Sequence, residues 1–330
     1  MKPLFIPLTL CALILGTPAY SQSKSEAPVK KPTVKKAPVP AGPNPTISNS
    51  PYGPHERQVV DFYKAESDAP TPLVFYIHGG GWMGGDKAKV SGLKDYLAEG
   101  ISVVSINYRY VSQAIEAGIE PPVKWSLEDA ARALQFVRSK ADEWNIDPKR
   151  IGATGGSAGG ASTCWLCTHD DMADPNSADP VARESTRLMC GAPSGAQTCF
   201  DPHLLREWLP NMSYGGHAFG FRKDGISRQE EFQAFYDNRD KVMPWVEEYS
   251  AYHLVTPDDS PIFLQYGGDP KLLPEKGQSP KDPTHSAVLG LLFQTKLNEA
   301  GVENYIVYPG GPEAPWKSAT TFLIDRLKSE

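Results

Sequence analysis

The chain has 330 residues, of which 40% are hydrophobic and 22% are charged, and its formal net charge is −6. An acidic balance argues against a general nucleic-acid binder. After an N-terminal extension, about 280 residues remain, which is enough for one large α/β domain with a substantial core.

The N-terminus has the pattern of a secretory signal peptide. Met1-Lys2 is followed by an apolar run from Leu4 to Leu15 and then by small residues up to Ser21. The apolar run is too short to span a bilayer. We therefore expect residues 1–21 to be a signal peptide, so that the mature chain is secreted or periplasmic and has no transmembrane segment. Residues 22–50, rich in Lys, Pro, Ala and Ser, are predicted to be a disordered tether before a domain at 51–330.

The first half of that domain alternates between apolar runs and one amphipathic stretch. Strands are predicted at 56–63, 72–77, 101–109 and 150–154, the first of them antiparallel. A capping-box-like start at 126–129 precedes apolar residues at helical spacing. Alternation of this kind predicts a mostly parallel central sheet with crossover helices on its faces.

A glycine-rich motif follows the 72–77 strand. His78-Gly-Gly-Gly81-Trp82 places several backbone amides directly after a buried strand, without side chains between them and a bound substrate. A motif of this kind supplies half of an oxyanion hole. Beyond it, Asp86-Lys87 either fixes the loop through polar contacts or forms a solvated turn.

A second motif, Gly155-Gly-Ser157-Ala-Gly159, lies between the predicted strand at 150–154 and an apolar helical stretch at 160–167. A strand, a sharp turn and a helix form the context in which G-x-S-x-G exposes a nucleophilic serine at a helix N-terminus. We predict that Ser157 is the nucleophile and that the amides of Gly80, Gly81 and Ala158 form the oxyanion hole.

Together, the segment Gly79–Lys87 and the segment Gly155–Gly159 resemble the esterase and lipase branch of the α/β-hydrolases. The similarity is to bacterial carboxylesterases described as feruloyl-esterase-like or hormone-sensitive-lipase-like, and it covers roughly residues 52–330. The resemblance implies an α/β-hydrolase fold and ester chemistry, with a small-molecule or carbohydrate ester as substrate and neither a cofactor nor a metal ion.

The second half of the domain interrupts the alternation once. A strand is predicted at 188–192, and residues 199–250 are read as a helical, cap-like insertion. Its aromatic residues either line a substrate pocket or pack the insertion itself. Further strands are expected at 261–266 and 304–309. The helix between these strands is predicted to be capped by Asp282-Pro283 and to end at Gly301, and a closing helix is predicted at 321–327.

The candidates for the catalytic acid and base lie outside these two motifs. Asp269 follows the 261–266 strand and fits the chain order Ser, Asp, His of this fold, so we predict that it orients the base. The resemblance implies a histidine on the loop after the last strand. That loop, residues 309–317, contains none, and no histidine lies beyond position 285.

Three explanations are open. His285 can act as a displaced base, because the helix that it begins starts on the same rim as the strand ends. The base can instead come from the insertion, as His203, His217 or His253. Alternatively, catalysis has been lost and the cleft only binds a ligand. Two function classes therefore remain open. The first is an enzyme, either an exported carboxylic-ester hydrolase or a peptidase of related fold. The second is a non-catalytic binding protein of the same fold.

Four cysteines follow the predicted signal peptide. Cys164 and Cys167 lie within the helix after Ser157, where we expect them to pack in the core. Cys190 and Cys199 permit a disulfide, which the sequence leaves open. Neither spacing is typical of a metal site.

Overall fold

The computed structural model describes Met1 and residues 42–329, and the fold described below is that of residues 42–329. The predicted signal peptide, apart from Met1, and residues 22–41 of the predicted tether lie outside the described residues. Residues 47–51, which fall across the predicted tether boundary, form a strand, so the ordered domain begins before residue 51. In the part of the chain that the structure describes, no helix is both long and apolar enough to cross a membrane.

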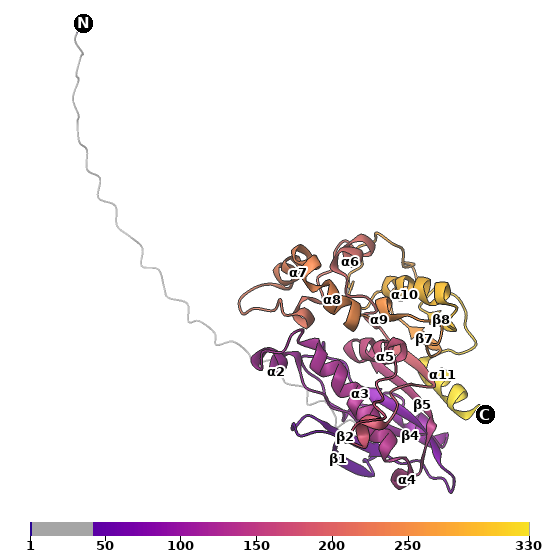
Figure 1. The fold of residues 1–330 in the computed structure, drawn as a ribbon. Helices are drawn as coiled ribbons and strands as arrows, with labels where there is room; N and C mark the ends of the chain where they lie inside the picture. Colours follow the sequence, from indigo (N-terminus) through magenta and orange to yellow (C-terminus); the bar gives the residue numbers. More distant parts are fainter. Residues whose placement is uncertain (2–41, 330) are drawn as a thin grey trace, which may run out of the picture. The chain divides into compact units, whose positions relative to one another are not determined.

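Eight strands form one sheet in the order β1-β2-β4-β3-β5-β6-β7-β8 (Figure 1). They are β1 Ile47–Pro51, β2 Val59–Tyr63, β3 Thr71–Ile77, β4 Ser102–Ile106, β5 Ile146–Gly156, β6 Cys190–Ser194, β7 Ile262–Gln265 and β8 Asn304–Val307. β2 pairs antiparallel with both β1 and β4, and all other pairs are parallel. The predicted mostly parallel α/β sheet is confirmed.

Helices cover both faces of the sheet. They are α1 Leu93–Ala98, α2 Val111–Glu116, α3 Val123–Ser139, α4 Ala141–Trp144, α5 Ala158–Thr168, α6 Pro202–Trp208, α7 Arg228–Asp237, α8 Arg239–Tyr249, α9 Ala251–Leu254, α10 Ala287–Ala300 and α11 Ala319–Lys328. α3, α5, α9 and α10 contribute to one apolar cluster, whereas α1 and α11 pack on the other face. The parallel strands are therefore buried on both sides, which explains their continuous apolar runs.

Two of the predicted helix starts are wrong. α3 begins at Val123 rather than at Ser126, because the Pro121-Pro122 pair sets the first turn and the Ser126 hydroxyl donates to the Arg109 carbonyl. α10 is capped by Ser286, whose hydroxyl accepts from the Val288 amide, and not by Asp282. The predicted end of this helix at Gly301, in a left-handed conformation, is confirmed.

The insertion at 199–250 contains α6, α7, α8 and a short 3-10 turn, Gly216–Phe219 (Figure 1). Its aromatic side chains mainly pack against one another. Phe219 stacks on Phe235 with ring centroids 5.2 Å apart, and Phe232 meets Phe235 edge-on at 6.0 Å. All three rings are almost fully buried, so their main role is to stabilise the insertion.

The four cysteines of the described residues are free and buried. Cys190 lies in the cluster with α11, whereas Cys199 lies in the cluster on the other face of the sheet. The permitted Cys190–Cys199 disulfide is therefore not formed, and Cys164 and Cys167 pack in the core as expected.

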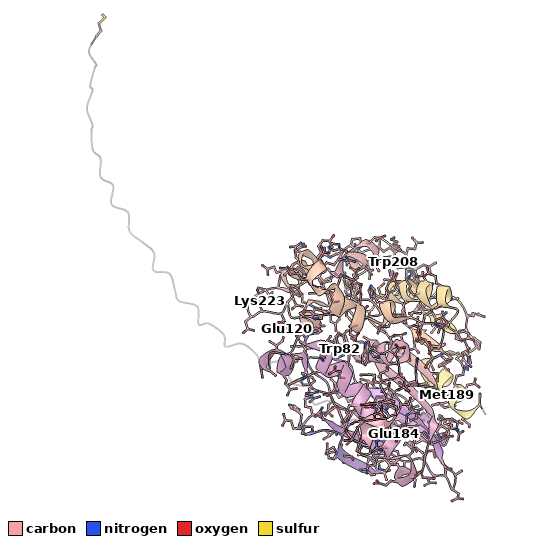
Figure 2. All side chains as sticks on the ribbon, viewed as in Figure 1. Trp82, Glu120, Glu184, Met189, Trp208 and Lys223 are labelled. Carbon is pink, nitrogen blue, oxygen red and sulfur yellow. The ribbon has the colours of Figure 1, made fainter. Side chains whose placement is uncertain are left out.

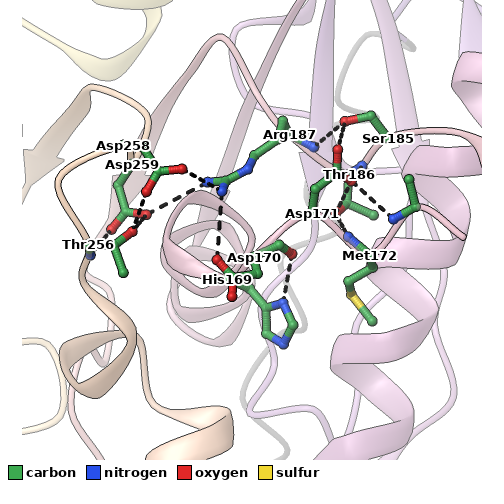
Figure 3. A network of polar contacts seen from close by, with 11 residues as sticks. His169, Asp170, Asp171, Met172, Ser185, Thr186, Arg187, Thr256, Asp258 and Asp259 are labelled. Carbon is green, nitrogen blue, oxygen red and sulfur yellow. Dashed lines mark hydrogen bonds and ion pairs between the residues drawn. The ribbon is translucent and has the colours of Figure 1, made fainter.

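A charged network fixes the loop after α5 (Figure 3). Arg187, three residues before β6, contacts Asp258 at 2.7 Å and Asp170 at 3.7 Å. Asp258 itself lies shortly before β7. Because β6 and β7 are parallel, this network lies at the end of the sheet where these strands begin, opposite the edge where the two sequence motifs lie. It therefore supports the fold and not the candidate site.

Candidate active site

Ser157 lies between β5 and α5, at the strand–helix turn where its motif predicts it. Its backbone has φ 54° and ψ −122°, a conformation that costs about 1–3 kcal/mol for a residue with a side chain and is typical of functional turns. The Ser157 amide donates to the Ser194 carbonyl at 2.9 Å, which fixes the turn against the end of β6.

His285 is the histidine that reaches Ser157. Its Nε2 lies 2.9 Å from the Ser157 hydroxyl oxygen, and its Nδ1 lies 2.7 Å from Oδ2 of Asp282. Because a carboxylate only accepts hydrogen bonds, Nδ1 carries the proton and Nε2 presents its lone pair to the serine. Ser157, His285 and Asp282 thus form a hydrogen-bonded chain of the kind that activates a hydroxyl.

The acid in this relay is Asp282, and the sequence-based choice of Asp269 was wrong. Asp269 is exposed, and its carboxylate accepts from the Lys271 amide at 2.9 Å, within its own turn. Asp282 lies three residues before His285, so one turn of chain brings its two oxygens to the His285 amide and ring. Partial burial works to raise the pKa of Asp282, but the hydrogen bond and charge of His285 bring it below its ordinary value.

Replacing Asp282 by asparagine is expected to lower kcat for an ester substrate by about 10- to 1,000-fold. The amide no longer selects the required imidazole tautomer, which in a buried triad costs roughly 10⁴-fold. A smaller loss is expected here because the Asp282 side chain is 62% exposed and water screens the pair. Steady-state kinetics on Asp282→Asn and on the matched variant Asp269→Asn test this. A larger loss in the Asp269 variant would restore the original assignment.

The histidines of the insertion have other partners. His217 Nε2 donates to the Gly81 carbonyl at 2.9 Å, and His203 Nε2 donates to the Tyr236 carbonyl at 3.1 Å. His253 lies in α9, just beyond the insertion, where its ring meets Tyr252 edge-on with centroids 5.2 Å apart. Within residues 42–329, the only imidazole that contacts the Ser157 side chain is that of His285. The structure therefore favours the displaced base over a base from the insertion.

The glycine motif lies directly against the serine turn. A Cβ atom on Gly79 would lie 2.5 Å from the Gly156 carbonyl oxygen and 3.4 Å from the Ser157 Cβ, so only glycine permits this approach. Gly80 and Gly81 have φ values of 109° and 63°. Their amides and the amide of Ala158 donate to no other group among the described residues. That these three amides converge on one oxyanion remains a prediction.

Several contacts hold this loop in place. Trp82, in the interior of the domain (Figure 2), has φ 54° and donates from its ring nitrogen to the Ser162 hydroxyl in α5 at 3.0 Å. The predicted role of Asp86-Lys87 in fixing the loop is confirmed. Lys87 forms a buried ion pair with Asp61 at 2.8 Å, and Asp86 accepts from Asn107.

His78 is a structural member of the motif. Its Nδ1 donates to the Gly79 carbonyl at 2.8 Å, and its ring stacks on Tyr108 with centroids 4.3 Å apart. Burial lowers the pKa of His78 to about 4, and the positive charge of Arg57 also disfavours the imidazolium. His78 is therefore neutral across the physiological range.

This neutral histidine predicts acid sensitivity. The pKa of His78 is below its unfolded value of 6.5, so the stability that it contributes is complete above pH 6.5 and is lost as the pH falls to about 4. The maximal loss is about 3 kcal/mol. Denaturant unfolding at pH 7 and pH 4.5 should show a flatter pH dependence for His78→Asn, which keeps a donor for Gly79 but does not titrate. If the free energy of unfolding falls equally with pH in the variant and in the unchanged chain, His78 is not the group responsible for the acid sensitivity.

A cavity of about 520 Å³ opens beside the base. It lies under the 266–286 connection, and its lining includes His285, Tyr308, Pro309, Leu272, Gln278 and Lys281. The loop at 309–317, where the resemblance places a histidine, instead packs on α11: Trp316 meets Phe322 edge-on at 4.9 Å. Among the described residues, no group of three His, Cys, Asp or Glu side chains is arranged to hold a metal ion.

Comparison with known proteins agrees with this architecture. Residues 60–186 match the family model described as BD-FAE. Gut esterase 1 of Caenorhabditis elegans is 30% identical over 122 residues, which are 36% of this chain and 22% of that protein. The chain thus spans less than a quarter of the length of this curated relative.

Two solved structures share the fold. A truncated carbohydrate esterase from gut microbiota aligns with a TM-score of 0.63 and 19% identity, covering 89% of this chain and all of that one. An acetyl ester-xyloside bifunctional hydrolase from Caldicellulosiruptor lactoaceticus aligns with a TM-score of 0.56 and 24% identity, covering 78% of each chain.

Proposed function

We propose that this chain is a carboxylesterase of the α/β-hydrolase superfamily and that it hydrolyses carboxylic esters through an acyl-enzyme on Ser157. The observation that carries the proposal is the 2.9 Å contact between the Ser157 hydroxyl and His285 Nε2, backed by Asp282 at 2.7 Å. A ligand-binding protein without catalysis has no need for this alignment.

In the proposed reaction, Ser157 gives its proton to His285 Nε2 and attacks the acyl carbon. The oxyanion that forms is held by the amides of Gly80, Gly81 and Ala158. Collapse of this intermediate breaks the bond to the alcohol oxygen, which takes the proton from His285. Water, deprotonated by the same imidazole, then releases the acid and restores the serine.

Pre-steady-state hydrolysis of p-nitrophenyl acetate tests this proposal. We expect a burst of nitrophenolate close to one equivalent of protein, followed by steady turnover, and no burst for Ser157→Ala. Turnover near background for the unchanged chain would support the alternative of a catalytically impaired hydrolase that binds a ligand in the same cleft.

For the substrate, we propose acyl esters of carbohydrates. Support comes from the two structural neighbours named above, one described as a carbohydrate esterase and the other as an acetyl ester-xyloside bifunctional hydrolase. It also comes from the cavity beside the base, where Tyr308 offers an aromatic face and Gln278 and Lys281 offer polar groups to an alcohol part. Release of acetate from an O-acetylated xylo-oligosaccharide at a higher kcat/KM than from ethyl acetate is expected. The reverse order would contradict this substrate class.

We also propose that the protein is exported, because residues 1–21 have the features of a signal peptide. Expression of the full chain in a bacterium with an outer membrane should give a processed protein in the periplasm or medium. Intact mass spectrometry would then locate the new N-terminus near residue 22. Unprocessed protein confined to the cytoplasm would contradict export.

A further inference from the structure

The base lies on a long irregular connection that the sheet alone does not fix. Residues 266–286 join β7 to α10 without a helix or strand of their own, and the His285 side chain is 43% exposed. A chain of this length and exposure loses its geometry unless it is anchored near the reacting group. The Ser157–His285 distance therefore depends on a contact close to residue 285.

Gln197 supplies such a contact from beneath the connection. It follows β6 and is only 2% exposed. Its side-chain nitrogen donates to the Gly195 carbonyl at 3.0 Å and to the Thr284 carbonyl at 2.8 Å. Both amide hydrogens are thus used, and one of them holds the residue directly before His285.

The segment that carries Gln197 also contacts Ser157 and His285. The Ser194 carbonyl accepts from the Ser157 amide at 2.9 Å. Gly195 has φ 56°, and the direction of its missing side chain points at the His285 ring, whose Cδ2 would lie 3.5 Å from a Cβ atom. Residues 194–197 therefore contact both the Ser157 turn and the segment that carries His285, and so fix the hydroxyl relative to the imidazole.

We propose that Gln197 is a positioning residue that holds His285 within reach of Ser157, an inference that rests on the proposed ester hydrolysis. The Oε1 atom of Gln197 is buried and has no partner among the described residues. A buried acceptor without a partner is unfavourable, so the stabilising contacts of this side chain are its two donated bonds. The usual position of the base, after β8, has no need for this contact, because there the loop at 309–317 would carry the histidine.

The test uses two substitutions of similar size. Gln197→Met removes both donors, and Gln197→Glu replaces them with a group that only accepts. For p-nitrophenyl acetate we expect kcat to fall roughly 10- to 100-fold with KM little changed, since a displacement of about 1 Å at a reacting group has this effect. Thermal unfolding identifies variants that do not fold, and either variant alone is sufficient for the test.

Gln135→Met is the matched control. Gln135 is also a buried amide, and its nitrogen donates to the carbonyls of Ala182 and Glu184, away from the candidate site. We expect it to lower thermal stability as much as Gln197→Met while leaving kcat unchanged. Equal losses of kcat in the two methionine variants would overturn the proposal.

A double-variant cycle separates positioning from general damage. In a chain that already carries His285→Ala, the change Gln197→Met should cause no further loss of kcat, because residues that act as a unit are not additive. A further loss of 10-fold or more would show that Gln197 acts independently of the base. If His285→Ala itself leaves kcat unchanged, the proposed function fails; if only the Gln197 variants are fully active, the positioning role fails alone.

Discussion

Replacing His285 by alanine is expected to lower kcat for p-nitrophenyl acetate by about 10²- to 10⁴-fold, with a small change in KM. The imidazole Nε2 is 2.9 Å from the Ser157 hydroxyl, and without it the hydroxyl is a poor nucleophile at neutral pH. The residual rate should come from the oxyanion loop, which the substitution leaves in place.

The matched controls are His203→Ala and His253→Ala. Neither imidazole contacts Ser157, and His203 instead donates to the Tyr236 carbonyl, so both variants should keep kcat near that of the unchanged chain. A loss confined to one of these variants, with His285→Ala fully active, would assign the base to the histidine replaced in that variant.

The second large effect concerns the packing of the serine turn. A Cβ atom on Gly159, in the first turn of α5, would overlap the Ile77 carbonyl oxygen and lie 2.8 Å from the His78 carbonyl oxygen. Both obstacles are backbone atoms at the end of β3, so neither can move aside. Gly159→Ala is therefore expected to lower the free energy of unfolding by more than about 4 kcal/mol, or to prevent folding.

Gly156→Ala is the control for this effect within the same motif. The nearest atom to a Cβ there is the Ser194 carbonyl oxygen at 4.0 Å, and the residue does not have a positive φ. Denaturant unfolding of the two variants should show near-normal stability for Gly156→Ala only. A stable, folded Gly159→Ala protein would contradict the close packing of α5 against β3.

The fold was predictable where burial dictates the sequence. The runs 72–77 and 101–109 are apolar because β3 and β4 are covered on both faces, and they read directly as strands. β1, Ile47–Pro51, was missed because its residues are polar and it forms the exposed edge of the sheet, where pairing with β2 provides its order. The start of α3 was misplaced because Ser126 and Asp129 bond to Arg109 and not to the helix terminus.

The site was predictable to the extent that a motif defines it. Ser157 and the loop at 78–82 belong to local patterns in which backbone geometry requires glycine. His285 was predictable only as one of several candidates, from the general position of helix starts near strand ends. Asp282 was mistaken for a helix cap because an aspartate that accepts from an amide three residues later has the same local sequence pattern, whether it caps a helix or orients a histidine. Gln197 had no signal in the sequence, since its partners are backbone carbonyls and the one that it holds next to His285 lies 87 residues away.

The most direct test of the displaced base is phosphonylation by a fluorophosphonate, followed by peptide mapping. We predict a single adduct on Ser157. It should form at least about 100-fold more slowly in His285→Ala than in the unchanged chain, because the reagent reacts with a serine hydroxyl that a general base has activated. An adduct on another residue, or an equal rate of labelling at Ser157 in both proteins, would contradict the assignment of His285 as the base.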